Sequence, residues 1–217
     1  MRVGKTGFLT DRPGPLRIGV FGGSFNPIHN GHMEAINVFK NALHLDAVLL
    51  VPSGASFYKQ TSPVSFAHRY RMCQLAAQGL SGVSASDVEG RHTAGMYSCD
   101  MLEAVKHLHP DATLFLLMGS DVYERVPLWK GLERIAGLAT LAVIIRSGIR
   151  CHREATENML QRYRLTTLFV HGGHAQSSTS VRREREQGRS IDAFVPPSVA
   201  DYIGEQQLYM KKEGALV

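Results

Sequence analysis

The sequence predicts a single α/β domain in which helices cover both faces of a parallel sheet of about six strands, a doubly wound sheet. Short apolar runs of strand length alternate along the chain with amphipathic helical patterns. Glycine or proline follows several of these runs, as at Gly22–Gly23 and Pro52. The 217 residues, 44% hydrophobic and 20% charged, suit one compact domain with a large core.

Six apolar runs are the predicted strands. Each is nearly continuous rather than alternating, which is typical of parallel strands that are buried on both faces. The runs are Arg17–Phe21, Ala47–Val51, Val83–Val88, Thr113–Met118, Leu138–Ile145 and Thr167–Val170.

Helical patterns fill most of the intervals between these runs. After the first run, Ile36, Phe39 and Leu43 share one face of a helix that begins near Asn30. Serine and proline, which favour helix starts, open most of the others. These predicted helices begin at Ser65, Ser98, Ser120, Arg153, Ser178 and Pro196.

The chain is expected to divide into a flexible extension over residues 1–15, one folded domain over 16–210 and a tail over 211–217. The extension is rich in glycine and proline and lacks the apolar stretch of a signal peptide. No apolar run approaches the roughly 20 residues that a membrane helix needs, so no membrane partner is expected. The cysteines, Cys73, Cys99 and Cys151, form no CxxC pair, and free thiols suit a cytoplasmic protein.

The net charge of +5 favours an anionic partner. Nucleic acid is one candidate, but the basic residues are scattered. The densest cluster, Arg182, Arg183 and Arg185, is interleaved with Glu184 and Glu186, as on a solvated helix face. An anionic small molecule is therefore expected, and no nucleic acid. A homodimer is left open.

In a doubly wound sheet the ligand lies beyond the carboxyl ends of the strands. The loops after Phe21, Val51, Met118 and Val170 should therefore surround one site. Both motifs that carry chemistry fall in these loops.

The first motif is Gly22–His32, which reads GGSFNPIHNGH. Its glycines let backbone approach a phosphate closely, and the helix start near Asn30 favours an anion. His29 and His32 lie three residues apart, so both imidazoles can donate hydrogen bonds to phosphate oxygens from one turn. Helix capping is the alternative, and a metal is not expected because no third ligand is nearby.

The second motif is Ser177–Arg182, at the start of a predicted helix. Backbone N–H groups and hydroxyls of Ser178 and Thr179 can bind an anion there. Arg182 lies one turn on, and its planar fork suits phosphate. A solvated helix start is the alternative.

The string HNGH matches the HxGH signature of the nucleotidyltransferase superfamily related to class I aminoacyl-tRNA synthetases. The longer string closely resembles the GG[ST]F[DN]PxHxGH pattern of the nicotinate-nucleotide adenylyltransferase family. The resemblance runs in register from about Arg17 to Tyr209. It continues in Pro52–Lys59, Ala67–Arg69, Met96–Ser98, Met118–Asp121, Val126–Trp129, Ser177–Arg182 and Asp201–Tyr209.

The resemblance implies a Rossmann-like HxGH nucleotidyltransferase domain. Its reaction would transfer the adenylyl group of ATP to nicotinate mononucleotide, giving nicotinate adenine dinucleotide and pyrophosphate in NAD biosynthesis. Mg²⁺ would be held mainly by ATP phosphates and water, and no protein ligand for a metal is named. The implied catalytic residues are His29, His32 and Arg182. The implied ATP-binding residues are Gly22, Gly23, Ser24, Phe25, Gly31, Gly119, Asp121, Ser177, Ser178 and Thr179.

The implied acceptor-binding residues are Lys59, Tyr97, Ser98 and Trp129. Lys59 would meet the acceptor phosphate and Trp129 would stack on the pyridine ring, although a single tryptophan can also be a core residue. Tyr97 and Ser98 would offer backbone N–H groups to the nicotinate carboxylate. Asp121 would hold the ribose of ATP, or would only stabilise the N-terminus of its helix with its negative charge.

The chain departs from the family pattern at four positions, which bear on acceptor-loop geometry: Tyr58, Ala67, Ser147 and Gln176.

Two alternative functions stay open. One is a sibling adenylyltransferase that uses nicotinamide mononucleotide or another phosphate acceptor. The other is a regulator that binds ATP without catalysis.

Overall fold

A computed structural model describes residues 2–3, 9–10, 13–54, 64–92, 95–148, 151–174 and 176–211. Lys59, the predicted contact of the acceptor phosphate, lies outside the described residues, as does Tyr58.

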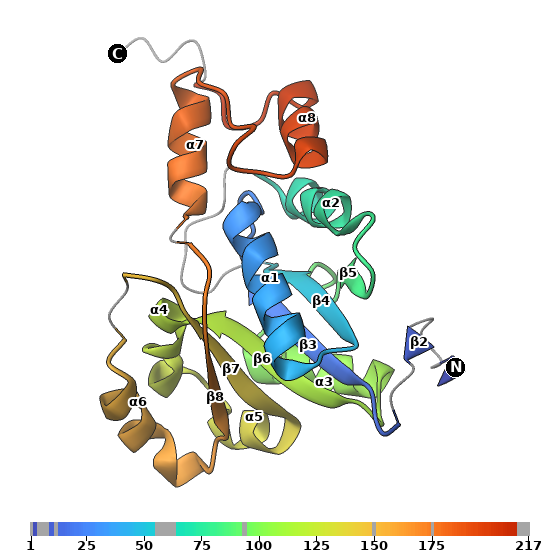
Figure 1. Cartoon of the computed structure of the whole chain (residues 1–217), viewed down its shortest axis with the longest axis vertical. Coiled ribbons are helices and arrows are strands. Elements are labelled where there is room, and N and C mark those ends of the chain that lie inside the picture. The colour runs from blue at the N-terminus through green and yellow to red at the C-terminus, as the bar shows by residue number, and fades with distance from the viewer. Residues whose placement is uncertain are drawn as a thin grey trace.

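A six-stranded parallel sheet forms the centre of the domain (Figure 1), which confirms the predicted fold class. The strand order is β5-β4-β3-β6-β7-β8. The chain winds outward from β3 to β4 and β5, then returns and winds the other way from β6. The direction of winding therefore reverses between β3 and β6, and doubly wound sheets bind ligands at such a reversal. The strands are β3 (Arg17–Gly23), β4 (Ala47–Pro52), β5 (Val83–Ala85), β6 (Thr113–Gly119), β7 (Ala139–Ile145) and β8 (Thr167–His171).

Helices cover both faces of the sheet (Figure 1). They are α1 (Asn30–Leu43), α2 (Phe66–Ala77), α3 (Ser98–Leu108), α4 (Ser120–Tyr123), α5 (Leu132–Leu138), α6 (Arg153–Leu160), α7 (Ser178–Glu186) and α8 (Pro197–Glu205). Two 3₁₀ turns, η1 (Val126–Leu128) and η2 (Gln161–Tyr163), accompany them. Figure 1 shows α2, α7 and α8 gathered at one end of the molecule and α5 and α6 at the other.

The observed elements differ from the predicted ones in three places. The strand predicted to reach Val88 ends at Ala85, and Val88 already belongs to a turn. The helix predicted over Arg153–Leu165 passes into the 3₁₀ turn η2 after Leu160. The short helix α5 was not predicted.

The strands bury alternate side chains in two separate cores, because successive side chains point to opposite faces of a sheet. On β6, Phe115 and Leu117 join the core under α1, α2 and α8. Leu114 and Leu116 join the core under α3 and α5. Burial on both faces explains why the strand sequences are almost uninterruptedly apolar.

The amphipathic face of α1 anchors this helix over the first core. Ile36 and Phe39 are both fully buried. Burying side chains of this size stabilises the fold by about 2 kcal/mol each. The helix therefore presents its first turn, which carries both histidines of the first motif, at a fixed place beside the strand ends.

The N-terminal segment contains β1 (Arg2–Val3) and β2 (Leu9–Thr10), which pair antiparallel. The predicted flexibility of residues 1–15 stays a prediction. Among the described residues, no helix has both the length and the apolar character needed to cross a membrane.

Candidate active site at the strand ends

A cavity of about 600 Å³ opens beyond the carboxyl ends of the strands. Its lining comes from the loops that follow all six strands of the sheet, which confirms that the strand-end loops meet at one site. The predicted site residues that line it are Gly22, Gly23, Ser24, Phe25, His29, His32, Tyr97, Ser98, Gly119, Asp121, Trp129, Ser177, Ser178, Thr179 and Arg182.

The two histidines stack at the start of α1. Their ring centroids lie 3.6 Å apart with an interplanar angle of 22°. His29 is the N-cap residue, and its backbone N–H donates to His32 Nδ1 at 3.2 Å. Since Nδ1 of His32 accepts this bond, its ring proton resides on Nε2 when the ring is neutral. His32 thus has both a capping role and an available donor.

Both imidazoles are neutral near pH 7. Burial, helped by the charge of Arg146, lowers the pKa of His29 to about 4. Burial and the neighbouring His29 and Arg146 hold the pKa of His32 well below its ordinary value. Each ring can therefore donate one hydrogen bond without carrying a permanent charge. Such donors suit an anion whose charge develops during a reaction.

The start of α7 is hydrogen-bonded directly to the first motif. Ser178 Oγ donates to the carbonyl oxygen of Pro27 at 2.9 Å, and Arg182 Nη1 donates to that of Asn26 at 2.7 Å. Arg182 Nη2 donates to Thr179 Oγ1 at 3.2 Å. Two segments about 150 residues apart in the sequence therefore form one wall of the cavity. Ser177, rather than Ser178, is the N-cap of α7.

Gln176 joins these segments to a third one. Its Oε1 accepts from the Gly31 N–H at 3.1 Å, and its Nε2 donates to the carbonyl oxygen of Phe194 at 2.7 Å. Gly31 is thereby engaged by protein and does not line the cavity. A Cβ at Gly31 would lie 3.1 Å from Gln176 Cβ, a tight contact that glycine avoids. Gln176, a departure from the family pattern, has a structural use here.

A buried arginine connects the loops after β3 and β4. Arg69 donates from Nη1 to the carbonyl oxygen of Ser24 at 2.8 Å and from Nη2 to that of Ser53 at 2.7 Å. Nearby, Glu89 Oε2 accepts from the Gly54 N–H at 3.0 Å. Burial raises the pKa of Glu89 to about 6, although Gly54 and Arg69 oppose the shift.

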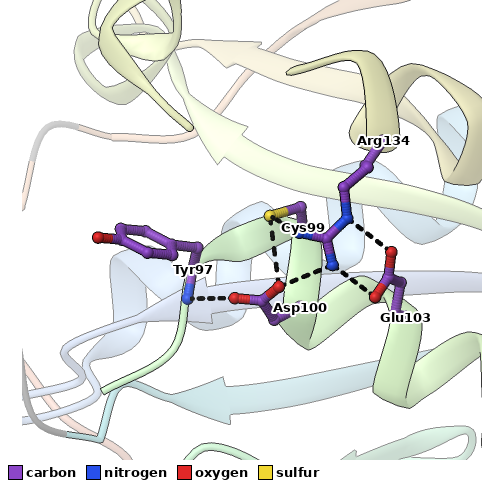
Figure 2. A network of polar contacts seen from close by, with 5 residues as sticks. All are labelled: Tyr97, Cys99, Asp100, Glu103 and Arg134. Atoms are coloured by element: carbon purple, nitrogen blue, oxygen red, sulfur yellow. Dashed lines mark hydrogen bonds and ion pairs between the residues drawn. The ribbon is translucent and has the colours of Figure 1, made fainter. Parts of the chain in front are cut away.

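Trp129, Tyr97 and Ser98 lie at another part of the cavity wall. Trp129 packs against the second core and also lines the cavity. Its stacking on a pyridine ring stays a prediction. Tyr97 is the N-cap of α3, and its backbone N–H donates to Asp100 Oδ2 at 3.3 Å (Figure 2). Lys130 Nζ lies 5.0 Å from the centroid of the Tyr97 ring.

Several cavity residues were not predicted as site residues, and those with a charged or amide side chain are Arg146, Gln176, Lys130 and Glu89. Arg146 directly follows β7, and the rule that ligands bind at strand ends could have identified it. Lys130 could have been found as the neighbour of Trp129. Gln176 was noted only as a departure from the family pattern, and Glu89 gave no signal. The contacts of both residues join segments that are distant in the sequence.

No group of three or more histidine, cysteine or acidic residues in the described part of the chain could hold a metal ion. The two carboxylates that line the cavity belong to Asp121 and Glu89.

The family model described as cytidylyltransferase-like matches residues 20–184. The chain therefore belongs to the cytidylyltransferase-like family, and the match spans both motifs and nearly the whole sheet.

Two relatives that carry the name of an activity are similar to almost the whole chain. A protein named probable nicotinate-nucleotide adenylyltransferase from Thermomicrobium roseum is 36% identical, over 92% of this chain and 94% of the relative. A protein of the same name from Maridesulfovibrio salexigens is 32% identical, over 91% of this chain and 99% of the relative.

A solved structure agrees on the fold. The nicotinic acid mononucleotide adenylyltransferase of Plasmodium falciparum, complexed with NaAD, superposes with a TM-score of 0.70 at 21% identity. The alignment covers 89% of this chain and 97% of that one.

Proposed function

We propose that this chain transfers the adenylyl group of ATP to nicotinate mononucleotide, forming nicotinate adenine dinucleotide and pyrophosphate in NAD biosynthesis. The observation that carries the proposal is the convergence of His29, His32 and the start of α7 on one cavity wall. The names of the relatives, at up to 36% identity over most of the chain, support the same activity.

The reaction requires positioning and charge stabilisation. A phosphate oxygen of the acceptor attacks the α-phosphorus of ATP in line and forms a new P–O bond. The bond from the α-phosphorus to the bridging oxygen breaks, and its electron pair leaves with pyrophosphate. Since the attacking phosphate is already anionic near pH 7, no general base is needed.

The phosphate end of the cavity, which is the part bounded by the two histidines and the start of α7, fits this chemistry. His32 Nε2, the Arg182 guanidinium and the first N–H groups of α7 supply donors for the triphosphate. Arg146 adds a permanent positive charge in the same region, where it depresses the pKa values of both histidines. Neutral donors and fixed charges together stabilise the extra charge of the transition state.

The acceptor would occupy the part of the cavity bounded by Tyr97, Ser98 and Trp129. The Trp129 ring would stack on the pyridine ring, and Lys59 is proposed to meet the acceptor phosphate. Asp121, in the first turn of α4, would accept hydrogen bonds from the ATP ribose.

Magnesium would accompany the triphosphate and neutralise part of its charge. Asp121 and Glu89 are not joined by a third ligand in the described residues. This donor set suits an ion held mostly by phosphates and water. We propose that the reaction takes place in the cytoplasm, which the free cysteines support.

Product formation tests the proposal. The purified chain is incubated with ATP, Mg²⁺ and either nicotinate or nicotinamide mononucleotide, and pyrophosphate and dinucleotide are measured together. We expect equal amounts of both products, formed faster with the nicotinate acceptor. Faster reaction with nicotinamide mononucleotide would identify the sibling enzyme, and no pyrophosphate with either acceptor would support a binding role.

A further inference from the structure

The beginning of α3 carries acidic residues close to the proposed acceptor. Asp100 lies in the first turn and Glu103 one turn later, while Tyr97 and Ser98 of the same segment line the cavity. Uncompensated carboxylates at this position would repel an anionic ligand. They would weaken the attraction that the helix N-terminus offers to such a ligand.

A single arginine from α5 pairs with both carboxylates and offsets part of their charge (Figure 2). Arg134 Nη2 lies 2.7 Å from Asp100 Oδ1, and Arg134 Nε lies 2.7 Å from Glu103 Oε1. Nη2 also contacts Glu103 Oε2 at 2.5 Å. Hydrogen bonds from Arg134 lower the pKa of Glu103. Partial burial opposes the same change at Asp100, yet the bonds from Arg134 and the Tyr97 N–H keep its pKa below the ordinary value.

The same arginine fixes the separation of two segments that border the acceptor end of the cavity, which is the part bounded by Tyr97, Ser98 and Trp129. Arg134 Nη1 contacts Cys99 Sγ at 3.2 Å, and Cys99 is buried. A Cβ at Gly131, whose φ is +71°, would lie 2.7 Å from this sulfur. Gly131 directly follows Trp129 and Lys130, so close packing of α5 on α3 sets the position of both side chains.

Asp100 connects the network to the cavity wall. One carboxylate oxygen faces Arg134, and the other accepts from the Tyr97 N–H (Figure 2). The Tyr97 N–H is therefore engaged by protein, whereas the sequence suggested that it would serve the acceptor. Ser98, as the first helical residue, retains an N–H with no partner inside the helix.

We propose that Arg134 is a positioning residue that makes this end of the cavity selective for an acceptor with an anionic ring substituent. The inference rests on the proposed adenylyl transfer. Arg134 cancels the charge of Asp100 and keeps that carboxylate turned to the cap of α3. The Ser98 N–H and Lys130 are then the groups that face the substituent, and both attract an anion.

Replacement by a neutral residue tests the proposal. In Arg134→Met, the ratio of kcat/KM for nicotinate over nicotinamide mononucleotide should fall roughly three- to ten-fold, a size limited by solvent exposure of the network. The loss should appear in the KM of nicotinate mononucleotide, with the KM of ATP unchanged. At about 0.5 M KCl, screening should bring the ratio in the variant back toward that of the wild type.

Two further variants distinguish an electrostatic effect of Arg134 on the ratio from a structural effect. Arg134→Lys should retain most of the ratio. Asp100→Asn in the Arg134→Met background should restore it, because the uncompensated charge in the first turn of α3 is removed. Arg153→Met is the matched control, since Arg153 pairs with Glu157 on an exposed helix away from the cavity.

An equal loss with both acceptors, accompanied by a lower Tm and no rescue by Asp100→Asn, would overturn the proposal and leave Arg134 a structural link. An unchanged ratio would overturn it as well. Failure of the proposed function is a different result, in which the wild-type chain forms no dinucleotide with either acceptor.

Discussion

The two ends of the cavity are built differently. At the phosphate end, Ser178 and Arg182 donate hydrogen bonds to backbone carbonyls of the segment that leads to His29, which is almost completely buried. At the acceptor end, the Tyr97 N–H is held through Asp100 by Arg134, whose side chain is 46% exposed.

This difference separates the chemical step from the choice of acceptor. Donors that stabilise a transition state must be held in place before the reaction, so burial and direct hydrogen bonding suit the phosphate end. Recognition of an acceptor depends on a modest difference in affinity, which exposed charges can supply. Substitutions at the two ends should therefore change different kinetic constants.

The largest effect is expected at the phosphate end. His32→Ala should lower kcat on the order of 100-fold or more, because one donor to the developing charge is lost. Steady-state kinetics with saturating ATP and acceptor measures this change. His107→Ala, at an exposed position in the last turn of α3, is the control. A folded His32→Ala variant with normal turnover would refute the assigned role.

Glu89, which lines the cavity, should make the stability of the fold depend on pH. Its pKa is raised from 4.5 to about 6, so the folded state binds the proton more tightly than the unfolded state. The associated stability is present below pH 4.5 and is lost as the pH rises through 6. A shift of this size corresponds to about 2 kcal/mol.

Glu89→Gln removes this loss. Over a range from well below pH 4.5 to well above pH 6, the free energy of unfolding of the variant, relative to wild type, should therefore increase by about 2 kcal/mol. Urea titrations at several pH values measure the difference. A difference that is constant over this range would show that Glu89 does not titrate as described.

Trp129→Ala tests the acceptor end. Loss of stacking should raise the KM of nicotinate mononucleotide roughly ten-fold, while kcat and the KM of ATP change little. Initial rates with each substrate varied in turn distinguish these constants. If the KM of ATP rises equally, Trp129 supports the cavity as a whole and the two ends are not separable.

Ser177→Ala should have the smallest effect. Ser177 Oγ accepts from the Ser180 N–H at 3.1 Å and caps α7. Its loss should lower the free energy of unfolding by about 1 kcal/mol. Chemical denaturation measures this loss, and Ser190→Ala, in an exposed loop, is the control. If the change in kcat, converted to an activation free energy, exceeds the change in the free energy of unfolding, the hydroxyl contacts substrate.

Sequence patterns predicted the sheet because most strands are nearly continuous apolar runs and glycine or proline follows several of them. They predicted α1 from its apolar face and α7 from the serines at its start. The strand-end rule then placed His32 and Arg182 at one site, which the hydrogen bonds between Arg182 and Asn26 support.

The sequence could not predict contacts that depend on three-dimensional proximity. Gln176 meets Gly31, which is 145 positions away, and Arg134 meets Asp100, which is 34 positions away. The short helix α5 was missed because seven residues offer too little periodicity. Lys59 stays a prediction, since it lies outside the described residues.

The central claim is that His32 and the start of α7 hold the same triphosphate. A crystal structure of the chain with a non-hydrolysable ATP analogue and Mg²⁺ tests it most directly. We expect phosphate oxygens within about 3.2 Å of His32 Nε2 and, in the same molecule, of Arg182 or the first N–H groups of α7. A triphosphate that contacts one of these segments without the other, or that binds outside the cavity, would contradict the account.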